Sequence, residues 1–146
     1  MPDTTGPMRG LWTPRDFNSV TRPVALLIID DDEALTAALG AAFTAHGYRA
    51  LAVHGGAAAF QVPQAWTPHV VILDIEMPIC DGFCVAAALR GSTRFASVPI
   101  LAHSSLVEGE VKERGIAAGI DAFYRKGEPL HGLFEMIDHL APVRYL

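Results

Sequence analysis

The strongest constraint on the fold comes from apolar runs that end abruptly at a charged residue. Residues 24–29 form a continuous apolar run that stops at Asp30, and residues 70–73 form a second one that stops at Asp74. Runs without alternation between apolar and polar residues are typical of strands buried on both faces, as in parallel sheets covered by helices. The sequence therefore predicts an α/β protein built on a parallel sheet.

Strand and helix patterns alternate along the rest of this part of the chain. The expected strands are residues 24–29, 48–53, 70–73, 98–103 and 122–125, and the expected helices are 35–46, 57–66, 83–90, 106–118 and 130–140. Pro63 weakens the second of these helices, and Gly109 and Gly115 weaken the fourth. Parallel strands need crossover helices, and right-handed crossovers place them on both faces. We expect a doubly wound, five-stranded parallel sheet with about five helices.

The length of the chain allows one domain and a short extension. At roughly 150 residues per domain, 146 residues make a single domain. Residues 1–23 are rich in proline and have no apolar periodicity, which predicts an irregular N-terminal arm. A mobile tail is favoured over an arm pinned to the domain through Leu11, Trp12 and Phe17. The expected division is arm 1–23, folded domain 24–142 and C-terminal tail 143–146.

Composition excludes several classes of protein. The apolar run 24–29 is far shorter than the about 20 residues that cross a bilayer, and no secretion signal is evident. A net charge of -5 argues against binding to nucleic acid. Two cysteines are too few for a disulfide framework or a convincing metal site, so we expect Cys80 and Cys84 to be buried or half-buried thiols. A cytoplasmic protein without a nucleic-acid or membrane partner is expected.

Polar side chains follow four of the five predicted strands. The carboxyl ends of parallel strands meet at one edge of the sheet, where ligands bind, and here they carry Asp30, Asp31, Asp74, Ser104 and Lys126. Each alone has a structural explanation as a helix cap, a turn residue or a solvated charge, and Asp32 is expected to be a cap. Their convergence favours a functional site instead.

The chemistry of this set points to phosphoryl transfer. Clustered carboxylates repel one another and offer the hard oxygen ligands that suit Mg²⁺. An ammonium and a hydroxyl beside them can stabilise a transferring phosphoryl group, and an aspartate can accept it as an acyl phosphate.

The segments that carry these residues resemble a known family. Residues 27–32 (LIIDDD), 72–82 (ILDIEMPICDG), 99–105 (PILAHSS) and 119–126 (GIDAFYRK) are similar to the receiver domains of bacterial two-component response regulators, and the resemblance covers residues 24–140. It implies a flavodoxin-like fold with strand order 2-1-3-4-5. It also implies that Asp74 accepts a phosphoryl group from a phosphohistidine on a histidine kinase or a histidine phosphotransfer protein.

The resemblance assigns roles to the neighbouring residues. Asp31 is implied as a direct Mg²⁺ ligand, Asp30 as a ligand through water, and the backbone carbonyl of Glu76 as a further ligand. Ser104 is implied as the switch hydroxyl, Phe123 as the switch aromatic and Lys126 as the contact to the phosphoryl oxygens.

Three positions depart from the family pattern. Gly127 replaces the proline that usually follows the lysine, so we predict a trans peptide there, which leaves the placement of Lys126 open. The side chain of Glu76 has three expected positions, competing for Mg²⁺, pairing with Lys126 or facing water. His103 is expected to be a satisfied buried histidine without a catalytic role.

The leading hypothesis is a stand-alone response regulator that signals to a downstream protein by contact. Its docking surface, or the interface of a possible homodimer, is expected on the face formed by residues 106–118, 122–125 and 130–140. One alternative is a pseudo-receiver adaptor that works without phosphorylation. A second alternative is a Mg²⁺-dependent aspartyl phosphohydrolase, whose Asp-x-Asp pattern the sequence Asp74-Ile75-Glu76 only approximates.

Overall fold

The computed structural model describes residues 8–144 and contains the expected parallel sheet. Five strands pair in the order β2-β1-β3-β4-β5, all of them parallel. Their bounds are β1 (Ala25–Ile29), β2 (Arg49–Val53), β3 (Val70–Leu73), β4 (Ile100–Ser104) and β5 (Ala122–Arg125). This topology confirms the predicted doubly wound fold and its strand order.

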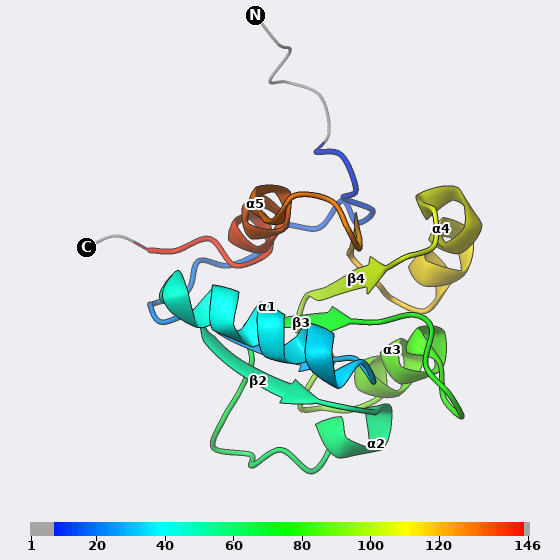
Figure 1. Ribbon diagram of the computed structural model, residues 1–146, viewed down its shortest axis with the longest axis horizontal. Helices are drawn as coiled ribbons and strands as arrows, with labels where there is room; N and C mark the ends of the chain where they lie inside the picture. Colours follow the sequence, from blue (N-terminus) through cyan, green and yellow to red (C-terminus); the bar gives the residue numbers. More distant parts are fainter. Residues whose placement is uncertain (1–7, 145–146) are drawn as a thin grey trace, which may run out of the picture.

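Helices cover both faces of the sheet (Figure 1). One face carries α1 (Glu33–Ala45) and α5 (Leu130–Leu140), and the other carries α2 (Gly56–Ala59), α3 (Gly82–Arg90) and α4 (Glu108–Ala117). Successive side chains of a strand point to opposite faces, so Leu26 and Ile28 of β1 join one core cluster and Leu27 and Ile29 join the other. Within residues 8–144, no helix has the length and apolar character needed to cross a membrane.

Several element bounds differ from the sequence expectation. The second helix covers only Gly56–Ala59 instead of residues 57–66. It stops before Pro63, which has no N–H to donate and disfavours the helical conformation in the residue before it. The fourth helix begins at Glu108 rather than at residue 106, because Val107 is still extended, with φ -76° and ψ 147°.

Two local predictions are confirmed. Asp32 caps α1 by accepting a hydrogen bond from the Leu35 N–H at 3.0 Å. The peptide between Lys126 and Gly127 is trans, since the one cis peptide among the described residues is Arg22–Pro23. Gly127 has a φ of +90°, a backbone conformation that glycine adopts without strain.

The prediction of free thiols is wrong. Cys80 and Cys84 form a disulfide, with their Cα atoms 5.4 Å apart. Cys80 lies in the turn after β3 and Cys84 in the first turn of α3, whose N-cap is Asp81. The chain reverses there, and this reversal brings the two Cβ atoms close enough for a bond.

The arm is packed on the domain rather than free. Leu11 forms an antiparallel bridge with Ala122 of β5, and Val20 forms a parallel bridge with Val143. Trp12 packs against the core cluster on the α3 and α4 side of the sheet, and Phe17 against the cluster on the other side. The preference for a mobile tail is therefore wrong for residues 8–23, while residues 1–7, 145 and 146 lie outside the described residues.

Candidate phosphoryl-acceptor site

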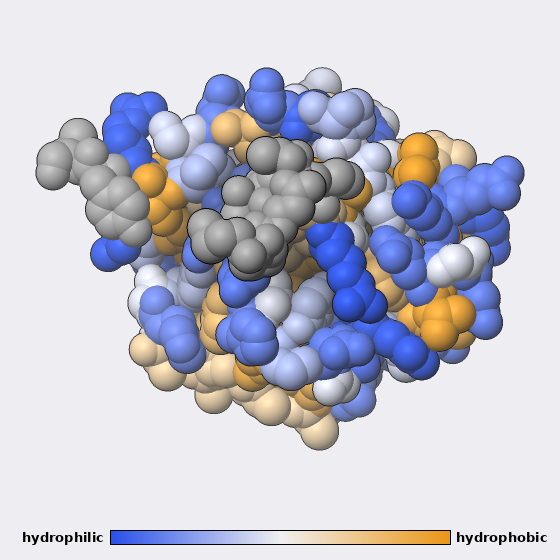
Figure 2. Space-filling view, turned by 90° about the horizontal axis from the view of Figure 1, so that it is seen from above, coloured by the Kyte–Doolittle hydropathy of each residue, from blue (hydrophilic) through white to orange (hydrophobic). Residues whose placement is uncertain are grey.

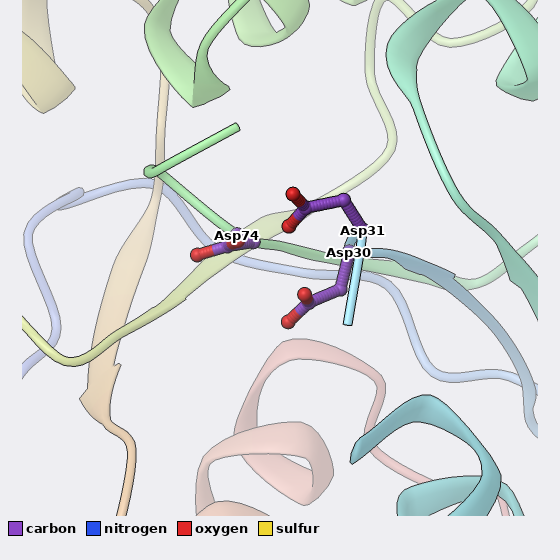
Figure 3. A group of neighbouring side chains, drawn as sticks. All are labelled: Asp30, Asp31 and Asp74. Carbon is purple, nitrogen blue, oxygen red and sulfur yellow. The ribbon is translucent and has the colours of Figure 1, made fainter. Parts of the chain in front are cut away.

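The register of the sheet brings three carboxylates together. Ile29 of β1 is paired with Leu73 of β3, so the residues that follow these strands lie side by side. Each of Asp30, Asp31 and Asp74 places one ligand oxygen within 4.8 Å of the others (Figure 3). Asp30 and Asp74 are only 2% and 3% exposed, whereas Asp31 is exposed. The predicted acidic cluster is thus present, with two of its members buried.

Lys126 reaches both buried carboxylates. Its Nζ atom lies 2.9 Å from Oδ2 of Asp30 and 3.2 Å from Oδ1 of Asp74. The Lys126 N–H donates to the Ser104 carbonyl at 2.8 Å, which continues the β4–β5 ladder and fixes the position of the lysine. The structure therefore holds the ammonium at the acidic cluster with Gly127 in place of proline.

Backbone amides orient the two buried aspartates. Oδ1 of Asp30 accepts from the Asp32 N–H at 2.9 Å, and Oδ1 of Asp74 accepts from the Glu76 N–H at 3.2 Å. The nearest contact of Lys126 and the hydrogen bond from the Glu76 N–H both fall on Oδ1 of Asp74. Oδ2 is therefore the less engaged of the two carboxylate oxygens.

Burial and charge set the ionisation of this cluster. Burial and then the negative charge of Asp30 raise the pKa of Asp74 to about 6, against the opposing pull of Lys126 and the Glu76 N–H. Burial alone would lower the pKa of Lys126, but its hydrogen bonds and charge contacts with the two aspartates raise it instead. At neutral pH Asp74 is therefore mainly ionised, at an energetic cost that a bound cation would reduce.

The remaining residues predicted for the site lie around this cluster. Ser104 is fully buried, and its Oγ accepts from the Leu106 N–H at 3.1 Å. Phe123 is 6% exposed and packs in the core cluster on the α3 and α4 side. His103 is buried, and burial and then the charge of Lys126 lower its pKa to about 4, so it is neutral at pH 7.

Glu76 makes a contact that sequence reasoning missed. Its side chain accepts a hydrogen bond from the Ser105 hydroxyl at 2.8 Å, and no contact with Lys126 is present among the described residues. This bond connects the loop after β3 with the loop after β4. The only available signal was a second serine directly after Ser104, which is too common a pattern to predict the pairing.

The matching family model settles the identity of the domain. The model of the response regulator receiver domain matches residues 26–138. The chain belongs to this family. The receiver domain is therefore a member of a family of phosphoacceptor signalling domains, and it brings together the carboxylates and the lysine that sequence analysis singled out.

The relatives of this receiver domain are longer proteins. It is 31% identical over 141 residues to the gliding motility regulatory protein of Myxococcus xanthus and 33% identical over 107 residues to the transcriptional regulatory protein PrrA of Mycobacterium tuberculosis. These matches include 96% and 73% of this chain. They span only 18% and 45% of the two relatives.

Solved structures share the fold. The chemotaxis protein CheY4 of Vibrio cholerae matches with a TM-score of 0.75 and 23% identity, over 80% of this chain and 98% of that one. The receiver domain of the sensor histidine kinase PA1611 of Pseudomonas aeruginosa matches with a TM-score of 0.71 and 19% identity, over 80% and 97% of the chains. That structure has a magnesium ion coordinated in its active-site cleft.

The raised pKa of Asp74 predicts that removing its charge stabilises the metal-free protein. The pKa of Asp74 in the folded protein lies above that of an unfolded aspartate, so protonation of Asp74 favours the folded state. This contribution to stability is present below about pH 4 and is lost as the pH rises through about 6. We expect Asp74→Asn to gain about 1–2 kcal/mol in free energy of unfolding at about pH 7.5, and much less at about pH 4.5. Urea denaturation in EDTA measures both values.

Asp32→Asn is the matched control for this prediction. Asparagine keeps the cap of α1 and removes a negative charge outside the buried pair, so this variant should gain no stability at about pH 7.5. Equal stability of Asp74→Asn and the parent protein at about pH 7.5 would contradict the prediction.

Proposed function

We propose that this receiver domain accepts a phosphoryl group on Asp74 from a phosphohistidine and signals through protein contact. The observation that carries the proposal is the ammonium of Lys126, which bridges Asp30 and Asp74 beside the exposed carboxylate of Asp31. This arrangement offers a nucleophile and a cationic contact at one edge of the sheet. The assignment of arm 1–23, receiver 24–142 and tail 143–146 is part of the same proposal.

Asp74 acts as the nucleophile in the proposed step. An oxygen of its carboxylate attacks phosphorus, the bond between phosphorus and the imidazole nitrogen breaks, and the imidazole leaves with the electron pair of that bond. Oδ2 suits this attack because the contacts of Lys126 and of the Glu76 N–H both fall on Oδ1. Lys126 then balances negative charge on the phosphoryl oxygens as a point charge.

The donor set fits Mg²⁺. Asp30, Asp31, Asp74 and the backbone carbonyl of Glu76 would hold the ion, and all four are oxygen donors, as Mg²⁺ prefers. Two buried carboxylates share one lysine, so the cluster retains negative charge for a cation to neutralise. When bound, the ion supplies positive charge to the oxygens of the transferring group.

The phosphorylated domain signals by changing its own surface. The added oxygens attract the Ser104 hydroxyl, and Phe123 repacks in response. The domain promotes its own phosphorylation and dephosphorylation and acts on no other substrate. A histidine kinase or histidine phosphotransfer protein supplies the phosphoryl group, and a downstream protein or a second copy binds the α4–β5–α5 face, in the cytoplasm.

Mass spectrometry of the intact protein tests the proposal. The full chain is incubated with Mg²⁺ and acetyl phosphate, and a mass increase of one phosphoryl group that hydroxylamine removes is expected. Asp74→Asn should abolish the adduct because the nucleophile is gone. Asp32→Asn, which removes a carboxylate at the same edge but keeps the cap of α1, should form it normally.

Other outcomes lead to the alternatives. Binding of Mg²⁺ without an adduct from acetyl phosphate or phosphoramidate would support a pseudo-receiver adaptor. Repeated turnover of an organic phosphate would support a phosphohydrolase. Either result would refute the proposed function.

A further inference from the structure

The arm occupies the open edge of the sheet. β5 is an edge strand, and the arm pairs with it through hydrogen bonds from the Phe123 N–H to the Gly10 carbonyl at 2.8 Å and from the Trp12 N–H to the Asp121 carbonyl at 2.8 Å. Leu11 forms the antiparallel bridge with Ala122 between them. Residues 10–13 thus act as an added strand that satisfies backbone groups of this edge.

Two glycines allow the close approach of the arm. Gly10 has a φ of +86°, and a Cβ atom there would collide with the carbonyl oxygen of Phe123. Gly115 lies in α4, and a Cβ atom on it would collide with the ring of Trp12. Gly115 was expected only to weaken its helix, whereas in the structure the ring of Trp12 packs directly against it.

Trp12 connects the arm to two elements of the domain. Its ring stacks on Phe123 of β5, with centroids 5.7 Å apart and planes inclined by 10°. Its Nε1 donates to Oε2 of Glu108, the first residue of α4, at 2.7 Å. Arg15 adds hydrogen bonds to the carboxylate of Asp121 at 2.9 and 3.1 Å. The docked arm therefore holds β5 and the start of α4 in one arrangement.

Phe123 and Glu108, two residues that the Trp12 side chain contacts, are both close in sequence to residues of the acceptor site. Phe123 precedes Lys126 by three residues on the same strand and loop, and Lys126 touches Asp74. Glu108 follows Ser104 by four residues, and the short segment between them is fixed by the bond from the Leu106 N–H to Oγ of Ser104. In the phosphorylated state proposed above, displacement of Oγ of Ser104 toward the phosphoryl oxygens on Asp74 would break its bond with the Leu106 N–H, and the segment that carries Glu108 would lose this restraint.

The arm also forms part of the face expected for docking. A hollow of about 650 Å³ lies there, and residues 8–10 form one wall of it, opposite the start of α4, β5 and α5. Figure 2, which views the molecule from the side of α5, shows a mainly hydrophilic surface with separate orange patches and a pale hydrophobic band along its lower edge. Release of the arm would remove this wall and expose the backbone edge of β5.

We propose that the arm is an autoinhibitory strand that is docked in the unphosphorylated protein and released when Asp74 is phosphorylated. The inference rests on the proposed function. Because linkage between two equilibria is reciprocal, an arm that phosphorylation weakens must in turn oppose the phosphorylated state. Loosening the arm therefore increases the affinity of the site for a phosphoryl mimic.

Fluorescence of Trp12 in the full chain tests the release. The protein has two tryptophans, and Trp66→Phe leaves Trp12 as the single reporter. Addition of Mg²⁺ with beryllofluoride should shift the Trp12 emission to longer wavelength and increase its quenching by acrylamide. Asp74→Asn in the same background should remove the response.

Affinity for beryllofluoride, followed by fluorine NMR, tests the reciprocal effect. Trp12→Ala should bind the mimic about 5- to 10-fold more tightly than the parent protein. Glu108→Gln keeps the packing of the ring and weakens only its hydrogen bond, so it should show a smaller gain in the same direction. Trp66→Phe, which is remote from the arm contacts, is the matched control and should bind as the parent does.

The outcomes separate this inference from the proposed function. An adduct on Asp74 with unchanged Trp12 emission and unchanged affinity of Trp12→Ala overturns the inference and leaves the proposed function intact. Weaker binding of beryllofluoride by Trp12→Ala also overturns the inference, because the docked arm would then favour the phosphorylated state instead of opposing it. Absence of any adduct or mimic binding overturns the proposed function, and the linkage with it.

Discussion

Asp121→Ala should lose about 3–5 kcal/mol of the free energy of unfolding, the largest stability effect that we expect from a single substitution in this protein. Asp121 is 3% exposed, and its carboxylate accepts from Arg90 at 2.8 Å, from Arg15 at 2.9 and 3.1 Å and from the Ile100 N–H at 2.8 Å. Alanine leaves the guanidinium of Arg90 without its counter-charge and the N–H of a buried strand without an acceptor. Each of these losses is costly in a protein interior.

Urea denaturation monitored by circular dichroism measures this loss. A typical domain is stable by about 5–15 kcal/mol, so the variant should unfold at markedly lower urea concentration. Asp138→Ala is the matched control, since Asp138 is exposed and accepts one hydrogen bond from Tyr48, and it should cost less than about 1 kcal/mol. A loss at Asp121 no greater than at Asp138 would show that the buried network contributes little.

Lys126→Gln should slow phosphorylation of Asp74 by about 100-fold, the range found when one electrostatic donor is removed from an active site. Nζ of Lys126 lies 2.9 Å from Oδ2 of Asp30 and 3.2 Å from Oδ1 of Asp74. Among the described residues, it is the side-chain cation that contacts both carboxylates. Without it the negative charge that arrives with the phosphoryl group has no ammonium partner. The rate of adduct formation from acetyl phosphate in saturating Mg²⁺ is the quantity to measure.

The chain offers a matched control for this substitution. The sequence contains one other lysine, Lys112, which is exposed on α4, and Lys112→Gln should react at the parent rate. Lys126→Arg keeps the charge but replaces a compact ammonium by a planar group, so it should restore only part of the rate. A rate for Lys126→Gln within about threefold of the parent would remove the lysine from the proposed chemistry.

The sheet could be predicted because the burial of a strand determines which residue types it contains. A strand covered on both faces reads as an unbroken apolar run, and both β1 and β3 do so before they end at aspartates. The carboxyl ends of parallel strands meet at one edge, so the approach of Asp30, Asp31 and Asp74 followed from the fold class alone. The position of Lys126 at the same edge could be predicted in the same way, because this residue directly follows the last strand.

Contacts between loops, and those of the arm, could not be predicted because they produce no recognisable sequence pattern. The bond between Glu76 and Ser105 joins residues on two different loops, and neither residue type is unusual in a loop. The disulfide between Cys80 and Cys84 depends on the reversal of the chain before α3, which a helical spacing of four residues does not reveal. The pairing of the arm with β5 depends on which strand lies at the edge of the sheet and on the space beside Gly115.

The sequence by itself determined the parallel sheet, the edge that carries the acidic residues and the resemblance to receiver domains, because these depend on local pattern and strand order. Only the tertiary structure decided that Asp121 anchors Arg90 and Arg15, and that Trp12 joins β5 to α4. These contacts connect residues about 30 to more than 100 positions apart, and a pattern read over neighbouring residues contains no information on such pairs.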